Sequence, residues 1–201
     1  MAREHRPAAG VHRGVVTDNK DPEGLARVRV SVPGLEPGET PWASVAAPMA
    51  GDRRGTYFLP EVGDEVLVAF AGGDPRAPYV LGALWGPDAR PPEDNADGGN
   101  HRRAIRSRSG HVIRLDDTPS AERIELVAAS GAGSIAIDAS AGSLAIEARG
   151  DVTIRSTGGT LRLEGVEVEL ESSGAVRIHG ALLELTGDGV TSVNGALVTI
   201  N

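Results

Sequence analysis

Hydrophobic and polar residues alternate over short segments throughout the first 85 residues. In the clearest segment, 25–32, Val28, Val30 and Val32 share one face, and Arg29 and Ser31 lie between them. Turns rich in Gly, Pro and Asp separate the segments. The pattern predicts five strands, at residues 11–17, 25–32, 42–47, 65–71 and 79–84. Five short strands with a long excursion between the third and the fourth predict a small OB-like barrel at 11–85.

The chain changes character after the predicted barrel. Residues 86–100 contain almost no apolar side chains and are rich in Pro, Gly and Asp, which is typical of a linker. We therefore divide the chain into an N-terminal extension (1–10), the barrel (11–85), a linker (86–106) and a repetitive region (107–201).

The repetitive region consists of apolar pairs two residues apart, with Gly or Ser at nearly every step. The markers Ile137, Ile146, Ile154 and Leu163 are separated by 9, 8 and 9 residues. The residues between the members of each pair are small or polar, such as Ala136, Ala145, Thr153 and Arg162. Each short strand therefore has one apolar and one solvated face.

A single chain cannot build a sufficient core from two inward side chains per strand. Three chains wrapped around a common axis would bring these pairs together. The predicted fold is all-β: a five-stranded OB-like barrel followed by a trimeric, intertwined (triple-stranded) β-helix. Its predicted trimer core consists of Ile135, Ile137, Leu144, Ile146, Val152, Ile154, Leu161, Leu163, Val176, Ile178, Leu183 and Leu185.

Composition narrows the functional classes. Aromatic residues make up 3% of the chain, which suits a slender core, and the absence of cysteine excludes a disulfide framework. The net charge is −8, so binding of nucleic acid is disfavoured. No apolar run has the ~20 residues that a transmembrane helix needs, and residues 1–10 do not resemble a signal peptide.

Candidate chemical groups are few. The carboxylate pairs Asp64-Glu65 and Asp116-Asp117, and Glu125, could serve acid–base catalysis, but their positions favour strand ends and turns. The five histidines form no metal-ligand spacing; a single inward His of a trimer could bind a metal, but alternation points His179 outward. A basic cluster, Arg102, Arg103, Arg106 and Arg108, is interpreted as a solvated collar rather than a DNA or lipid site. We expect several of the six aromatic residues in the core, and we predict no catalytic residues, no metal and no cofactor.

Specific segments then point to a family. Residues 14–17 (GVVT), 24–30 (GLARVRV), 59–70 (LPEVGDEVLVAF) and 72–82 (GGDPRAPYVLG) resemble the OB domain of phage baseplate spikes and of VgrG from type VI secretion. Residues 108–118 and 122–126 resemble the same family's entry into its β-helix. The resemblance covers about nine tenths of the chain. VgrG proteins carry a large hub region before the OB domain, and some phage spikes carry a lysozyme domain after it; neither has a counterpart in this sequence.

The resemblance implies a minimal spike, similar to baseplate assembly protein V, that pierces the target envelope mechanically. We expect a homotrimer on a separate baseplate hub protein, assembled in the bacterial cytoplasm without a signal peptide and touching the target envelope only on firing. An envelope-degrading enzyme and a carbohydrate-binding adhesin are the alternatives. The sequence does not choose between a phage, a tailocin and an extracellular injection system.

The C-terminal residues carry the last expectation. Strand 197–200 is followed only by Asn201, which would leave apolar, unpaired strand edges. Spikes that resemble this chain are commonly capped by a PAAR-type tip protein. We therefore expect tip docking through Val198, Thr199, Ile200 and Asn201, with Asn201 and ordered water as the alternative cap.

Overall fold

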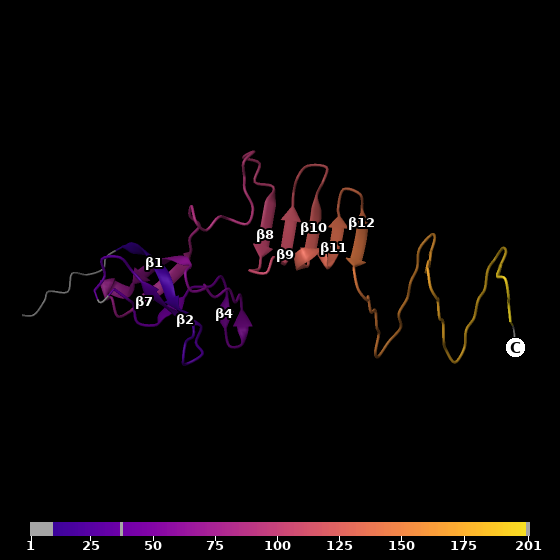
Figure 1. Cartoon of the computed structure of the whole chain (residues 1–201), viewed down its shortest axis with the longest axis horizontal. Helices are drawn as coiled ribbons and strands as arrows, with labels where there is room; N and C mark the ends of the chain where they lie inside the picture. Colours follow the sequence, from indigo (N-terminus) through magenta and orange to yellow (C-terminus); the bar gives the residue numbers. More distant parts are fainter. Residues whose placement is uncertain (1–9, 37, 200–201) are drawn as a thin grey trace, which may run out of the picture. The chain divides into compact units, whose positions relative to one another are not determined.

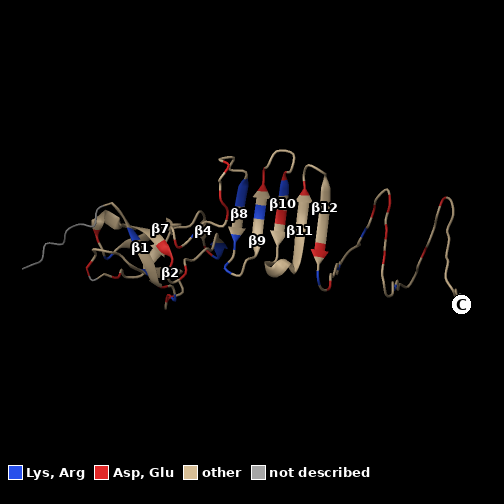
Figure 2. Cartoon of the chain, turned by 45° about the horizontal axis from the view of Figure 1, so that its top comes forward, with Lys and Arg blue, Asp and Glu red and all other residues tan. Residues whose placement is uncertain are grey.

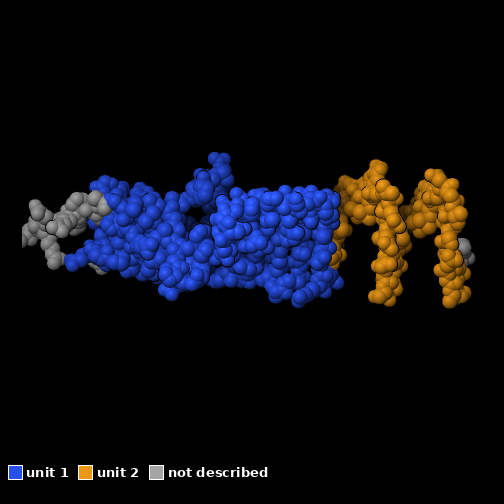
Figure 3. Space-filling view, turned by 90° about the horizontal axis from the view of Figure 1, so that it is seen from above, with its two compact units in different colours: residues 1–151 blue, residues 152–201 orange. Residues whose placement is uncertain are grey.

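The computed structural model describes residues 10–36 and 38–199, in which the regular elements are strands and two short 3-10 turns (Figure 1). Contacts divide the chain into two units, Met1–Asp151 and Val152–Asn201, each of which is described by itself (Figure 3). Within the described residues, no helix has the length and hydrophobicity to cross a membrane.

The first seven strands and one 3-10 turn lie within residues 11–83. They are β1 (Val11–Asp18), β2 (Arg27–Ser31), β3 (Ala43–Val45), β4 (Ala50–Gly51), β5 (Arg54–Gly55), β6 (Glu65–Phe70), η1 (Ala71–Gly73) and β7 (Pro78–Ala83). Five of them close into a barrel in the order β1-β2-β3-β7-β6, in which only β3 and β7 pair in parallel. This confirms the predicted five-stranded barrel, with strand bounds within two residues of those expected from the alternation.

The barrel interior is filled by β-branched side chains rather than aromatic ones. Alternate residues of each strand are buried, which is the period of a strand with one inward face. The core consists of Val16, Val28, Val30, Val32, Ala43, Val66, Val68, Phe70 and Val80, with Leu35, Val45 and Leu59 packed against it. Among the described aromatic residues only Phe70 is buried, so the expectation that several aromatics belong to the core is wrong. Valines fill the interior of so small a barrel, and the larger rings lie outside.

The turn between β1 and β2 is organised by one carboxylate. Asp21 accepts hydrogen bonds from the backbone N–H groups of Glu23 (3.1 Å) and Leu25 (3.0 Å). Its two oxygens also accept from Nε (2.8 Å) and Nη2 (2.7 Å) of Arg27 at the start of β2. The Asp21 side chain is only 3% exposed, and the Arg27 contact, followed by the backbone bonds, lowers the pKa of Asp21 far below its ordinary value.

A second sheet follows the barrel in the same unit. Its five strands are antiparallel neighbours in chain order, β8-β9-β10-β11-β12. Strand β8 lies within the segment predicted as a linker, so the sheet begins five residues before the predicted boundary at 107. The boundary was missed because Ala104 and Ile105, two adjacent apolar residues among four arginines, give no recognisable strand pattern. The elements are β8 (Arg102–Arg106), β9 (Val112–Asp116), β10 (Arg123–Val127), η2 (Ala129–Gly131), β11 (Gly133–Asp138) and β12 (Ser143–Ala148).

Residues 152–199 form no assigned strand and no backbone–backbone hydrogen bond. The segment turns back and forth as extended chain (Figure 1). Bends occur at Gly158, Val166, Gly174, Ala181, Gly189 and Ala196, at steps of 8, 8, 7, 8 and 7 residues. Each bend lies at a glycine or directly after one, so the predicted spacing of turns is present although the predicted strand pairing is not shown.

Candidate functional site

The most distinctive surface of the described chain is one face of the β8–β12 sheet. Its side chains form two rows across the strands, because each strand is in register with the next. One row runs Ile105, Ile113, Leu126, Ile135, Ile146, and the other runs Arg103, Leu115, Ile124, Ile137, Leu144. We call the nine Ile and Leu residues of these rows the apolar face.

The apolar face is open to solvent in the single chain. Its nine side chains are 40–63% exposed. A lone antiparallel sheet in water normally packs its apolar side against another element. Within the described residues the face borders a shallow hollow of about 460 Å³, lined among others by Ile113, Leu126 and Ile135. The face therefore has the chemistry of a protein core but no cover in the single chain.

The opposite face of the same sheet is charged, and its central side chains are more covered than the apolar ones. Arg114 donates to Glu125 across β9–β10 (3.0 Å) and to Glu93 of the preceding loop (2.8 Å). Arg102 pairs with Asp116 at 3.3 Å. Figure 2 shows Lys and Arg positions and Asp and Glu positions along the strands of this sheet. Arg114 thereby ties Glu93 of the loop 86–101 to this charged face.

Four of the predicted trimer-core residues lie on the apolar face. Ile135 is opposite Ile146, and Ile137 is opposite Leu144, in the β11–β12 ladder. The other eight lie in residues 152–199, where they are 54–68% exposed and in no strand: Val152, Ile154, Leu161, Leu163, Val176, Ile178, Leu183 and Leu185. Their role in a trimer core stays a prediction.

Five residues of the apolar face were not among the predicted core residues: Ile105, Ile113, Leu115, Ile124 and Leu126. The two adjacent apolar residues Val112 and Ile113 conceal which of them belongs to the apolar face. In the structure Val112 is buried on the opposite face, and Ile113 shares the apolar face with Leu115. Alternation within residues 113–115 and within residues 124–126 was the signal that would have found four of them, whereas Ile105 stands alone among arginines.

The predicted tip-docking residues are only partly within the described chain. Val198 is 47% exposed, and Thr199 is exposed as well. Ile200 and Asn201 lie outside the described residues. Docking of a tip protein here stays a prediction.

The carboxylates weighed as catalytic groups have structural partners. Asp116 accepts hydrogen bonds from the hydroxyl and the backbone N–H of Thr118, and these bonds, with Arg102, lower the pKa of Asp116. Asp117 pairs with Arg103 at 2.7 Å, and Asp64 accepts from the Glu61 backbone N–H at 2.8 Å. A general acid at neutral pH requires a raised pKa. Asp116 has the opposite shift, which suits a permanently ionised turn residue.

Several histidines and arginines that were considered as binding residues make structural contacts with nearby residues. Nδ1 of His111 accepts from the Ala129 backbone N–H at 3.0 Å, and His12 packs edge-on against Phe70. His179 is exposed, and His5 lies outside the described residues. No group of three or more potential metal ligands comes together in 10–36 and 38–199. In the predicted collar, Arg102, Arg103 and Arg108 each pair with a carboxylate.

Comparison with known proteins shows which protein family the barrel resembles. Residues 12–85 match the family model described as "Type VI secretion system/phage-baseplate injector OB domain". One similar protein is the type VI secretion system spike protein VgrG5 of Pseudomonas aeruginosa, 45% identical over 51 residues. Another is the type VI secretion system spike protein VgrG3 of Vibrio cholerae, 41% identical over 44 residues. The expected resemblance to the baseplate spike family is thereby confirmed for the barrel, and for residues 108–118 and 122–126 it stays a prediction.

These matches cover a minor part of the relatives. The aligned segments span 25% and 22% of this chain but only 6% and 4% of the two VgrG proteins. The likeness therefore concerns the spike family's OB region, and what the complete VgrG proteins do is not transferred with it.

Proposed function

We propose that this chain, whose barrel belongs to the injector OB-domain family of phage baseplates and type VI secretion, is the central spike of a contractile tail-like machine. Three copies assemble around one axis, stand on the baseplate and pierce the target envelope mechanically. The observation that carries the proposal is the apolar face of β8–β12, nine Ile and Leu side chains left 40–63% exposed in one chain.

Three copies of this sheet can cover one another. A triangular arrangement with the apolar faces inward leaves the charged faces and the Glu93-held loop outside. Full burial of an Ile or Leu side chain contributes about 1.5–3 kcal/mol, so covering these half-exposed side chains contributes on the order of 1 kcal/mol for each. Nine such side chains per chain supply a substantial driving force for association.

Residues 152–199 support the same assembly in a different way. Extended chain with unpaired backbone N–H and C=O groups and exposed Val, Ile and Leu side chains is unstable in isolation. Bends every seven or eight residues match a chain that contributes one short strand to each layer of a three-sided prism. We propose that neighbouring copies supply the missing strand partners here, whereas β8–β12 pair within one chain.

A mechanical role requires stiffness rather than chemistry. Inter-chain strand pairing over the whole of 152–199 would give a prism in which bending one chain breaks bonds to two others. The spike would concentrate the force of sheath contraction on a small area of envelope. The lowered pKa of Asp116, and the ion pairs or backbone hydrogen bonds of the other candidate carboxylates, support this role over hydrolysis of the cell wall.

Two protein partners are proposed with this role. The barrel end contacts a baseplate hub, and the C-terminal segment binds a PAAR-type tip protein. Support for the second partner is the exposure of Val190, Val193, Leu197 and Val198 near the chain end. Deleting residues 197–201 should abolish tip binding and leave the oligomer folded; unchanged tip occupancy would contradict the docking.

Sedimentation tests the core of the proposal. The purified full chain should have three times the 20.7 kDa chain mass and should keep it on dilution. A single-chain mass would overturn the assembly. Incubation of the same protein with purified cell walls distinguishes the enzyme alternative, because release of soluble wall fragments would require a hydrolytic site.

A further inference from the structure

One dipeptide of the C-terminal segment has a reactive combination of residues. Asn194 is followed by Gly195, and no other asparagine of the sequence precedes a glycine; Asn19, Asn95 and Asn100 are followed by larger residues. An asparagine loses its side-chain amide when the backbone nitrogen of the next residue attacks its Cγ. A next residue without a Cβ leaves that approach open and lets the backbone adopt the conformation that the attack needs. The sequence therefore singles out Asn194.

The reacting groups of this dipeptide are accessible in the single chain. Asn194 is exposed, and it lies just before the bend at Ala196. Its Nδ2 donates to Oγ of Ser192 at 2.7 Å, which leaves Cγ open to attack. Within the described residues the Gly195 N–H donates no hydrogen bond, since residues 152–199 contain no backbone pairing. A nitrogen that no acceptor holds is free to lose its proton and approach Cγ.

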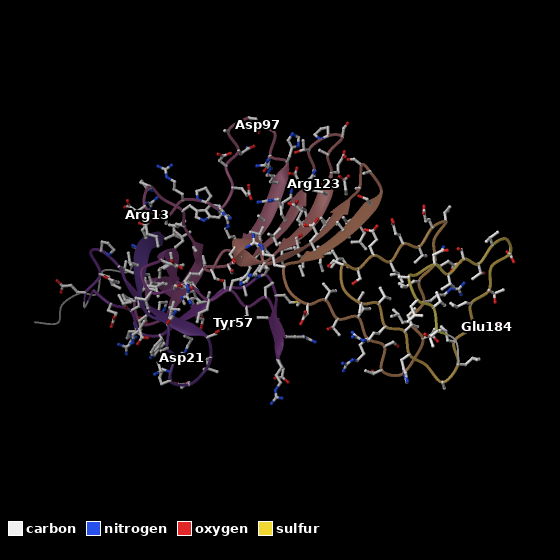
Figure 4. The ribbon with its side chains drawn as sticks, turned by 45° about the vertical axis from the view of Figure 1, so that its right-hand side comes forward. Arg13, Asp21, Tyr57, Asp97, Arg123 and Glu184 are labelled. Atoms are coloured by element: carbon white, nitrogen blue, oxygen red, sulfur yellow. The ribbon has the colours of Figure 1, made fainter. Side chains whose placement is uncertain are left out.

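The loop before β8 contains a related dipeptide whose groups are engaged. Asp97, labelled in Figure 4, precedes Gly98. The Gly98 N–H donates to the backbone oxygen of Asn95 at 3.0 Å, and Oδ1 of Asp97 accepts from the Gly99 N–H at 3.0 Å. Hydrogen bonding of the backbone is therefore what separates a restrained dipeptide of this kind from an unrestrained one.

We infer that Asn194–Gly195 is a self-modifying site: the unpaired chain converts the Asn194 amide into a carboxylate, and pairing of the segment in the assembled spike prevents the conversion. Protection rests on the proposed trimer, in which residues 152–199 form strands with other copies. In a paired strand the backbone is held extended and its N–H groups donate to neighbouring chains. The Gly195 nitrogen is then kept away from Cγ of Asn194.

The reaction needs water as its second reactant. The Gly195 nitrogen bonds to Cγ of Asn194, the Cγ–Nδ2 bond breaks, and ammonia leaves. The Gly195 N–H proton goes to solvent, and the departing nitrogen takes a proton from water or from the Ser192 hydroxyl that it contacts. Hydrolysis of the resulting succinimide adds one water. Cleavage of the bond to Cγ gives aspartate, and cleavage of the bond to the main-chain carbonyl gives isoaspartate.

Both products disturb the part of the chain that surrounds Asn194. Val193 and Leu197 are 69% and 85% exposed in the single chain, and in the proposed spike they are covered by other copies or by the tip protein. Aspartate places a charge between them. Isoaspartate adds a backbone carbon, which displaces the alternation of the residues that follow, such as Val198. A chain that waits unassembled therefore loses its fitness for the last layers of the spike.

Tryptic peptides of the full chain report the modification. Trypsin cleaves after Arg177, so the peptide that begins at Ile178 contains Asn194 and Asn201, which fragmentation in a mass spectrometer distinguishes. The full chain is incubated in mildly alkaline buffer with and without urea. In urea Asn194 should lose its amide faster than Asn19. In native buffer the loss should be about tenfold slower or more, the effect of about 1.4 kcal/mol of local protection.

Two variants test the assigned atoms. Asn194→Gln lengthens the side chain so that the succinimide ring does not form, and Gly195→Ala obstructs the attacking nitrogen. The Ala variant is tolerated, because a Cβ at Gly195 comes no closer than 3.4 Å to another residue and φ there is not left-handed. Both variants should keep the amide in urea. Gly158→Ala is the matched control in the same segment, since a Cβ there meets no atom within 4 Å, and it should leave the rate at Asn194 unchanged.

Sedimentation of the native protein separates failure of this site from failure of the proposed spike. An Asn194 amide that is lost in urea no faster than that of Asn19 would overturn the self-modifying site in any oligomeric state. Equally fast loss in urea and in a native trimer would overturn the protection and leave the trimeric spike standing. Fast loss in a native single chain would remove the trimer and the protection, and would leave the reactive dipeptide.

Discussion

Ile135 lies directly opposite Ile146 in the β11–β12 ladder, and both side chains are at least 40% exposed although they stand in the middle of an apolar row. A cross-strand pair of this kind stabilises a sheet most when a second layer excludes water from it. In the single chain no such layer covers the pair within the described residues. The two predictions that depend most directly on the apolar face therefore concern what happens when a charge is placed there.

Replacing Ile146 with Asp should prevent assembly of the sheet region. In a trimer with inward apolar faces the substitution places three carboxylates near the axis, where unpaired charges are strongly unfavourable. The expected result is a shift from trimer to smaller species in sedimentation. Ala145→Asp is the matched control, because Ala145 is the preceding residue of β12 and points to the charged face. Equal loss of assembly in both variants would contradict the assigned inward face.

The barrel was largely predictable, because its alternation is uninterrupted. Val28, Val30 and Val32 are all buried, as are Val66, Val68 and Phe70. The prediction that several aromatic residues lie in the core was wrong because the composition does not reveal the width of the barrel interior. Valine fills this barrel, and Tyr57, Tyr79 and Trp85 remain outside it.

The sheet was harder to predict for two physical reasons. Arginines surround the single apolar residue Ile105 in β8, so the strand looks like part of the linker. Adjacent apolar residues at Val112 and Ile113 conceal which of the two belongs to the apolar face. Residues 152–199 form no strand in one chain, so the strand pairing that we propose for them between copies is supplied neither by the alternation nor by the fold of one chain.

Asp21→Asn should lower the stability of the barrel at neutral pH and flatten its acid dependence. The folded pKa of Asp21 is lowered, chiefly by Arg27, so its stabilising contribution is present above the ordinary Asp pKa of about 3.9. That contribution is lost as the pH falls through the folded value. Wild type should therefore lose stability below about pH 4 more steeply than the variant.

Thermal melts between pH 2 and pH 7 measure this difference. Both tryptophans, Trp42 and Trp85, lie in or next to the barrel, so their fluorescence reports its unfolding. Asp52→Asn, at the exposed hairpin, removes one carboxylate elsewhere and should keep the wild-type pH profile. Parallel profiles for wild type and Asp21→Asn would show that the Asp21–Arg27 contact does not contribute.

Arg114→Gln should loosen the loop that precedes β8. Arg114 is the common partner of Glu93 and Glu125, and it is mostly covered. Its loss leaves Glu93 with only the longer contact to Arg102 (3.6 Å) and Glu125 with only the longer contact to Arg123 (3.6 Å). We expect a stability loss on the order of 1 kcal/mol. Proteolytic cleavage within residues 86–100 should also become faster. Arg106→Gln, at an exposed position of β8, is the control, and equal cleavage of both variants would argue against the Glu93 contact as the restraint.

Gly14→Ala should destabilise the barrel by about 1–3 kcal/mol, the usual cost of overpacking a core. A Cβ at Gly14 would clash with the Val30 side chain and would lie 2.9 Å from the backbone oxygen of Ser31. The backbone oxygen cannot move without breaking the β1–β2 ladder. Gly82→Ala is the control, since a Cβ there meets no atom within 4 Å. Denaturant midpoints should fall for the first variant and stay near wild type for the second.

Ile154→Asp tests whether the inward register of the apolar face continues beyond β12. Ile154 and Val152 have the same spacing as Leu144 and Ile146, and Ile154 is 66% exposed in the single chain. If three chains meet here, the substitution places three carboxylates together, and the C-terminal segment should become sensitive to protease while β8–β12 stay assembled. Thr153→Asp adds the same charge one residue earlier, on the outward side of the same register, and should be tolerated. Residues 152–199 have no strand partners in one chain, so their resistance to protease would have to come from other copies. If the segment is equally resistant to protease in both variants, Ile154 does not face the axis, and the proposed pairing between copies is wrong for the layer that contains Ile154.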